Sequence, residues 1–184
     1  MKTKLSIALV ALCTWMFTAC EHRGYPDGLP EFEHYYYAGF IPWNNDTVTV
    51  EREETELIKL PVHFHCEYIR KYDVQVRYFL KTSGIDHPAR EGVDFEIVDR
   101  NGNKITAASA GVYEMTFPEA RKGYDTIYVK PLAVNAADTR VIRIELCEGD
   151  NIHASESESR INHVTGDYTV ATFTQAYCRP LKFN

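Results

Sequence analysis

The 184-residue sequence lacks the short motifs that most directly indicate catalysis. It has no His-Glu-x-x-His, no Gly-x-Ser-x-Gly and no glycine-rich phosphate loop, so the usual signatures of metallohydrolases, serine hydrolases and nucleotide-binding proteins are missing. No stretch shows clear helical periodicity either, which points away from helical fold classes. We therefore predict a protein that is not an enzyme and needs no cofactor of its own.

Basic charge is also scarce. Lysine and arginine number 20 against 26 aspartates and glutamates, which gives a formal net charge of -6. No stretch gathers lysines and arginines into a basic stripe, the feature that a nucleic-acid-binding surface needs in order to neutralise phosphates. The sequence predicts no nucleic-acid partner.

Long hydrophobic runs are limited to the start of the chain. Lys2 and Lys4 precede a run without charges from Leu5 to Ala19, which is shorter than the roughly 20 residues of a transmembrane helix. A basic start, a short apolar stretch and small residues before a polar break are typical of a signal peptide, predicted here over residues 1–19. Its removal takes two lysines away and changes the charge from -6 to -8.

The end of this run, Phe17-Thr18-Ala19-Cys20, resembles the lipobox of bacterial lipoproteins. The resemblance implies that the Cys20 thiol receives a diacylglycerol and that cleavage leaves Cys20 as the first residue. Two or three acyl chains hold a protein stably on a membrane. We expect a lipid-anchored outer-membrane protein on the periplasmic or the cell-surface side. The alternative is an ordinary signal peptide cleaved near Ala19, with Cys20 incidental.

Residues 20–33 and 34–184 differ in character. The first segment contains two prolines, two glycines and many charges, which predicts an extended, flexible tether. The second shows period-two alternation almost throughout. In one such segment Leu60, Val62 and Phe64 share a face, while His63 and His65 share the opposite one.

Seven to nine such short segments in about 140 residues predict an all-β fold, an immunoglobulin-like antiparallel β-sandwich. In "RVIRIELC" the same alternation puts Ile142, Ile144 and Leu146 inward. The longest interruption, Glu148 to Asp167, is rich in serine and glutamate and is expected to be a solvated, mobile loop.

Three cysteines remain beyond Cys20. Alternation places Cys66 on an inward face and Cys147 on an outward one, so a disulfide between them is unfavourable. An exported protein permits disulfides. A Cys147–Cys178 disulfide and free thiols both stay open.

The segment Gly92-Val93-Asp94-Phe95 resembles the Gly-x-Asp-Tyr/Phe signature of Calx-β domains, and the strands that follow fit the same order between Thr47 and Leu146. The resemblance implies an immunoglobulin-like sandwich and calcium bound by acidic clusters, with Asp94 at the one matching acidic position. The segment after Leu132 and the carboxyl end lack the acidic runs of that family. The alternative role for Asp94 is a turn residue that bonds nearby backbone N–H groups.

With the lipobox, the chain also resembles small lipoproteins of Bacteroidota.

Aromatic and histidine residues supply the remaining candidates for binding. In "HYYYAGFIPW", Tyr36 and Trp43 are candidate ligand-binding residues, because exposed aromatic rings stack on sugars or anchor a protein partner; the alternative is an edge strand that packs into the core. His63 and His65 form a His-x-His pair that could chelate zinc, although no third ligand is identifiable.

Asp46-Thr47-Val48 and Asp125-Thr126-Ile127 resemble the acceptor for O-glycosylation in Bacteroidota, which makes Thr47 and Thr126 candidate modification sites.

Three functional hypotheses follow from the sequence. The first is a non-catalytic cell-envelope lipoprotein whose sandwich binds a glycan or another envelope protein. The second is a structural or adhesin subunit of a surface assembly, which an unpaired terminal strand would favour. The third is an enzyme that uses a metal held by His63 and His65, and the resemblance to Calx-β domains implies a calcium-binding module as a further alternative.

Overall fold

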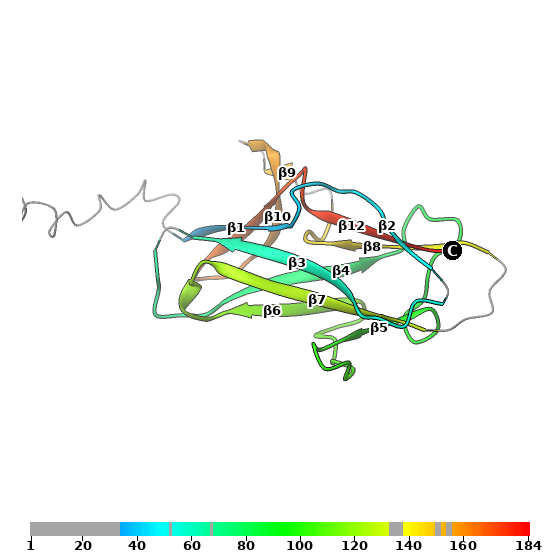
Figure 1. The fold of residues 1–184 in the computed structure, drawn as a ribbon. Helices are drawn as coiled ribbons and strands as arrows, with labels where there is room; N and C mark the ends of the chain where they lie inside the picture. Colours follow the sequence, from blue (N-terminus) through cyan, green and yellow to red (C-terminus); the bar gives the residue numbers. More distant parts are fainter. Residues whose placement is uncertain (1–33, 52, 67, 133–137, 150–151, 154–155) are drawn as a thin grey trace, which may run out of the picture. The chain divides into compact units, whose positions relative to one another are not determined.

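The computed structural model describes residues 34–184 apart from 52, 67, 133–137, 150–151 and 154–155. The predicted signal peptide, Cys20 and the tether lie outside the described residues. Residues 34–184 form one compact unit, an all-β sandwich of two sheets (Figure 1). The predicted fold class is therefore confirmed. No helix in the described part of the chain is long and apolar enough to span a membrane.

The two sheets contain seven and five strands, more than the number predicted, because the structure includes short strands that leave little trace in the sequence. The seven-stranded sheet has the order β5 (Phe95–Val98), β7 (Gly123–Pro131), β3 (Ile58–His65), β1 (Tyr35–Phe40), β11 (Thr169–Phe173), β10 (Glu156–Val164), β9 (Ile152–His153). The five-stranded sheet has the order β2 (Val48–Val50), β12 (Cys178–Phe183), β8 (Arg140–Glu145), β4 (Val74–Lys81), β6 (Val112–Phe117). A 3-10 turn, Pro118–Ala120, follows β6.

Most neighbouring strands are antiparallel, as predicted, but two pairs are parallel. β1 pairs with β11 in parallel and with β3 in antiparallel fashion, and β12 pairs in parallel with β2 and antiparallel with β8. Strands from the beginning and the end of the domain therefore meet within both sheets. The first and the last strand each have hydrogen-bonded neighbours on both sides.

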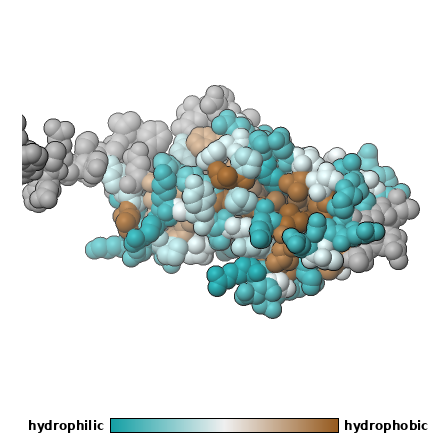
Figure 2. Space-filling model, in the orientation of Figure 1, coloured by the Kyte–Doolittle hydropathy of each residue, from teal (hydrophilic) through white to brown (hydrophobic). Residues whose placement is uncertain are grey.

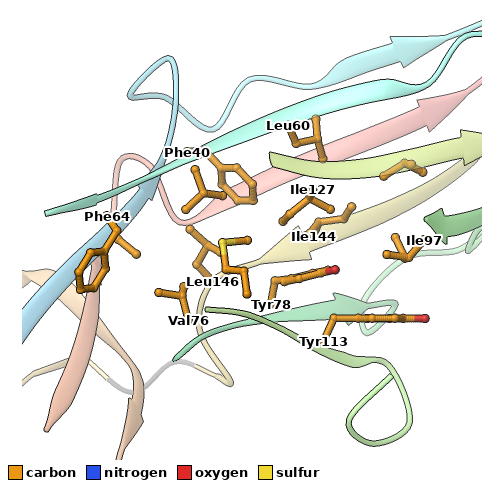
Figure 3. Close-up of a cluster of buried hydrophobic side chains, with 14 of the residues drawn as sticks. Phe40, Leu60, Phe64, Val76, Tyr78, Ile97, Tyr113, Ile127, Ile144 and Leu146 are labelled. Atoms are coloured by element: carbon orange, nitrogen blue, oxygen red, sulfur yellow. The ribbon is translucent and has the colours of Figure 1, made fainter. Parts of the chain in front are cut away.

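The core lies between the sheets and follows the alternation of the sequence. Leu60, Val62 and Phe64 of β3 are buried, and Ile142 and Ile144 of β8 face them from the other sheet. Figure 3 shows this packing of aliphatic and aromatic side chains from both sheets. Full burial of such a side chain stabilises a fold by about 1.5–3 kcal/mol. On the outside, hydrophilic side chains surround a group of hydrophobic ones on the face that Figure 2 shows.

The prediction of a mobile loop from Glu148 to Asp167 is wrong, because β9 and β10 lie within this segment. Polar side chains near the end of β10 attach it to the first part of β4, which pairs with β6 on one side and with β8 only from Phe79 onward. The Asn162 amide accepts from the Arg77 N–H (3.0 Å) and donates to the carbonyls of Arg77 (2.6 Å) and Leu146 (2.8 Å). The Tyr168 hydroxyl accepts from the Gln75 N–H (3.0 Å). A polar, serine-rich sequence gives no apolar alternation by which such a strand could be recognised.

The prediction that Cys147 faces outward is also wrong. β8 ends at Glu145, so the alternation stops before Cys147, which is fully buried. Cys178 is buried as well, whereas Cys66 is partly exposed, and all three thiols are free. Burial raises the pKa of Cys147 to about 11 and that of Cys178 to about 12. Of the two alternatives left open by the sequence, the structure shows the free thiols.

Candidate functional site

Aromatic side chains gather on the outer face of the seven-stranded sheet. The register places Tyr37 opposite His65, and His63 between Gly39 on one side and Tyr124 on the other. Side chains two residues apart on a strand share a face, so these neighbours point the same way. We call the following group the aromatic surface: Tyr35 and Tyr37 of β1, Trp43 of the loop after β1, His63 and His65 of β3, Tyr124 of β7, and Phe173 of β11.

The rings of the aromatic surface touch one another in a continuous row. The His63 ring stacks on Tyr124 at 4.5 Å between centroids and meets the edge of Trp43 at 6.0 Å. Trp43 in turn meets Phe173 at 5.6 Å, and Phe173 stacks on Tyr37 at 4.8 Å. Tyr124 is 69% exposed and Trp43 41% exposed, so the row is open to solvent at its largest rings.

A buried arginine holds the loop that carries Trp43. The Arg179 side chain, only 3% exposed as a residue, donates to the Pro42 carbonyl (2.8 Å) and to the Asn44 amide oxygen. Its guanidinium lies 5.3 Å from the centre of the Phe40 ring. Burial lowers the pKa of Arg179, yet the hydrogen bonds to loop oxygens compensate the buried charge. The arginine therefore holds the loop in place from the buried side.

Two further contacts restrict Trp43 itself. The Asn45 side chain donates to the Thr174 carbonyl (2.7 Å) and accepts from the Cys178 N–H (3.0 Å), which joins the loop to the connection between β11 and β12. Gly39 lies directly under the indole: a Cβ atom at this position would stand 2.5 Å from Cζ3 of Trp43. The indole therefore rests on the backbone of β1, and only glycine leaves room for it.

A hollow of about 510 Å³ adjoins the aromatic surface. It lies between β6 and β7, and Tyr124 forms part of its wall together with Tyr128, Arg100 and Glu114. Ligands bind preferentially where a surface is concave and offers a few polar groups. Tyr124 thus belongs both to the row of rings and to this hollow.

No family model and no curated protein matches the chain. Solved structures do show a likeness. The apo-form Calx CBD1 domain aligns over 81% of this chain and 97% of its own, at 13% identity and a TM-score of 0.45. The calcium-binding domain CBD12 of CALX1.1 aligns over 74% of this chain and 44% of its own, at 14% identity and a TM-score of 0.37.

Asp94 does not fit the calcium site that the resemblance to Calx-β domains implies. The residue is 3% exposed, and both carboxylate oxygens accept from Nη1 of Arg140 (2.9 and 3.0 Å). One oxygen also accepts from the Arg90 N–H (2.7 Å). A calcium ion needs six to eight oxygen ligands, and here a guanidinium already neutralises the carboxylate. The alternative, a turn residue that bonds the backbone, describes Asp94 correctly.

His63 and His65 share the outer face of β3, as predicted, with ring centroids 6.2 Å apart. Within the described residues, no group of three histidine, cysteine, aspartate or glutamate side chains is placed to hold a metal ion. Burial, and then the positive charges of Lys122 and His65, lowers the pKa of His63. The pair therefore belongs to the aromatic surface and lacks the third ligand that zinc requires.

Tyr36 is not a surface residue, so that prediction is wrong. It is 3% exposed, packs against Phe64 and hydrogen-bonds the Tyr72 hydroxyl (2.6 Å). The reason is its position: Tyr36 faces inward, where the five-stranded sheet covers it, while Tyr35 and Tyr37 face outward. The second candidate, Trp43, lies in the aromatic surface. Its supports, Gly39 and Arg179, could not be recognised from the sequence pattern.

The two candidate O-glycosylation sites differ in exposure. Thr47 is exposed in the loop before β2, whereas Thr126 is partly exposed within β7, opposite Pro61. Modification of either threonine stays a prediction. Cys20 lies outside the described residues, so its lipidation stays a prediction as well.

Proposed function

We propose that this chain is a non-catalytic cell-envelope lipoprotein whose sandwich binds carbohydrate on the aromatic surface. The observation that carries the proposal is the continuous row of ring contacts from Tyr124 through Trp43 to Tyr37. Sugar rings have apolar C–H faces that pack on flat aromatic rings. Aromatic residues that combine a large contact area with few rotatable bonds are suited to this task.

A polar group within the row supports the same function. Nε2 of His63 is buried and has no hydrogen-bond partner among the described residues. Buried polar atoms normally have a partner, so an orphaned one marks a place where a ligand group or water belongs. Because His63 lies between Trp43 and Tyr124, a shift of the exposed Tyr124 ring would open Nε2 to the hydroxyl of a sugar that packs on the neighbouring rings.

The fixed position of Trp43 also favours binding of a ligand. Arg179, Asn45 and Gly39 hold the indole before any ligand arrives, so little conformational entropy is lost on binding. The second hypothesis, a surface-assembly subunit, has less support. In the described chain both terminal strands, β1 and β12, are already paired on both sides, which leaves neither free for exchange with another subunit.

The binding test compares Trp43→Ala and Tyr124→Ala with wild type on a glycan array, followed by titration calorimetry. Each ring contributes about 0.5–1.5 kcal/mol, so we expect each variant to bind about 2- to 13-fold more weakly. Ile69→Ala, which shortens a side chain 60% exposed in the β3–β4 connection, is the control and should bind normally. If no glycan binds and a partner protein co-purifies instead, the carbohydrate proposal fails.

The cellular part of the proposal has its own test. Cys20→Ser should move the protein from the membrane to the soluble fraction, because the acyl anchor is lost. Proteinase treatment of intact cells, with a periplasmic control protein, then distinguishes the cell surface from the periplasm. Membrane association that survives Cys20→Ser would contradict lipidation at this residue.

A further inference from the structure

The part of the seven-stranded sheet's outer face that β7, β3, β1 and β11 form has a charge opposite to that of the chain. Alternation and register assign the outward positions of the sheet's second to fifth strands, β7, β3, β1 and β11. These positions are Tyr124, Thr126, Tyr128 and Lys130 of β7; Lys59, Pro61, His63 and His65 of β3; Tyr35, Tyr37 and Gly39 of β1; and Thr169, Ala171 and Phe173 of β11. None of them is a carboxylate, although the chain contains 26 aspartates and glutamates.

We propose that the ligand of the aromatic surface is an acidic polysaccharide, whose anionic groups are recognised by the lysines of this face. The inference rests on the proposed function and adds the chemical class of the ligand. The face offers aromatic rings on which sugar units can pack. Its charged outward side chains, Lys59 and Lys130, are both positive and can pair with anionic substituents of the sugars. A neutral glycan would make no use of the lysines, nor of the absence of carboxylates from the outward positions of these four strands.

The lysines are placed to meet a chain that runs along the strands from the aromatic surface. Lys59 faces outward from β3, four residues before His63, which corresponds to about 13 Å along the strand. Lys59 is exposed and stands opposite Tyr128 of β7, and exposed Lys130 follows two residues later. A polysaccharide of several units can therefore contact the rings at one end and the two lysines at the other.

The carboxylate of the neighbouring edge strand already has a partner. Glu96 of β5 stands opposite Lys130, but its oxygen lies 3.6 Å from Nζ of Lys104. With the Glu96 charge compensated by Lys104, the positive charges of Lys59 and Lys130 remain available to a ligand. At the other end, Lys122 precedes β7 and contributes to the positive potential that lowers the pKa of His63.

Other polyanions fit this face less well. A membrane surface would need a broad apolar patch or a dense cluster of lysines, whereas this face has one row of rings and two lysines about four strand residues away. Nucleic acid would require a basic stripe, and the chain as a whole carries a net charge of -6. An acidic polysaccharide matches both the row of rings and the spaced cations.

The test measures binding of the full folded domain to two matched pairs of polymers. Polygalacturonate is compared with its fully methyl-esterified form, and dextran sulfate with dextran. We expect the acidic member of at least one pair to bind at least about fivefold more tightly, and raised sodium chloride to weaken that binding. The pair that shows the difference identifies carboxylate or sulfate as the recognised group.

Variants separate the charge from the rings. Lys59→Gln combined with Lys130→Gln should weaken binding of the acidic polymer by about 5- to 30-fold, because each exposed cation contributes roughly 0.5–1 kcal/mol. Lys182→Gln, on β12 of the other sheet, is the matched control and should change nothing. Trp43→Ala should weaken binding of every polymer that binds. Unchanged thermal unfolding of each lysine variant confirms that it is folded.

Each outcome bears on one of the two proposals. Equal binding of acidic and neutral members, or full affinity in the double lysine variant, overturns the inference and leaves carbohydrate binding intact. Binding to none of the four polymers and to no array glycan overturns the proposed function. Binding to phosphatidylglycerol vesicles without binding to any polymer also overturns the inference, since a lipid surface would then be the anionic partner.

Discussion

Replacing Gly39 with alanine moves the indole of Trp43 without deleting it. The added Cβ would stand 2.5 Å from Cζ3, whereas carbon atoms in contact are about 3.5–4.0 Å apart, so the ring must move by about 1 Å or more. Because Trp43 is 41% exposed, it can tilt outward. Trp43 meets His63 and Phe173 edge-on, at interplanar angles of 85° and 68°, so a ring that tilts outward loses these two contacts and the row of rings is interrupted at its centre.

The change should cost little stability and much affinity. Overpacking costs about 1–3 kcal/mol, and replacing glycine within a strand returns about 0.5–1 kcal/mol, so the net loss is about 1 kcal/mol. For a domain of this size that lowers the melting temperature by about 2–4 °C. The affinity for a bound glycan should fall by about 5- to 10-fold, which approaches the effect of Trp43→Ala.

Calorimetric titration with the best glycan from the array measures the affinity, and scanning calorimetry measures the stability. Gly166→Ala is the matched control, because a Cβ at this position meets no atom within 4 Å and the backbone needs no positive φ. If Gly39→Ala binds the glycan like wild type while Trp43→Ala does not, the position of the indole is unimportant and the argument from preorganisation is refuted.

Three further predictions concern the scaffold. Asn162→Leu should lower the free energy of unfolding in urea by about 3 kcal/mol, because the backbone N–H and C=O of Arg77 lose their partner inside the protein. Burial lowers the pKa of His163 from an ordinary 6.5 to about 4, so on acidification the unfolded chain binds a proton before the folded one does. The free energy of unfolding should therefore be constant above pH 6.5 and decrease between pH 6.5 and pH 4 by up to about 1.4 kcal/mol per pH unit. Asp94→Asn should destabilise the fold by about 3 kcal/mol, since the largely buried Arg140 loses its carboxylate, and neither calcium nor a chelator should change the melting temperature of the wild type.

Exposed residues of the same types provide the controls for these three predictions. Asn101→Leu and Asp138→Asn alter exposed positions and should unfold like wild type. For the pH dependence, His163→Gln should flatten the decline below pH 6.5, whereas His87→Gln, at an exposed position, should leave it unchanged. A decline that is the same in His163→Gln as in wild type would show that another group is responsible, and a rise of melting temperature with calcium would contradict the assignment of Asp94.

Much of the fold could be predicted because it depends on alternation. The burial of Leu60, Val62 and Phe64 and the outward position of His63 follow from period two alone. β10 could not be found in this way, since Asn162 attaches it to β4 through polar bonds rather than through an apolar face.

The candidate site was only partly accessible from the sequence. Trp43 could be named from its type and surroundings, but the choice of Tyr36 beside it failed, because adjacent tyrosines on a strand face opposite sides and the pattern did not show which side is covered. Tyr124 and Phe173 join the surface through register between strands far apart in the chain. Arg179 follows Trp43 by more than a hundred residues, and only the three-dimensional contact reveals its role.

The central place of β1 has a mechanical consequence. The chain enters the sandwich at this strand, the fourth of seven, with β3 hydrogen-bonded on one side and β11 on the other. If the preceding segment is held at a membrane and the aromatic surface holds a polymer, tension between them acts along β1. Both ladders of hydrogen bonds then bear the load together in shear, rather than one after another as in peeling. Of the aromatic surface, Tyr35 and Tyr37 lie on β1, and His63, Tyr124 and Phe173 lie on other strands of the same sheet, so under these conditions the force would run through the seven-stranded sheet and bypass the five-stranded one.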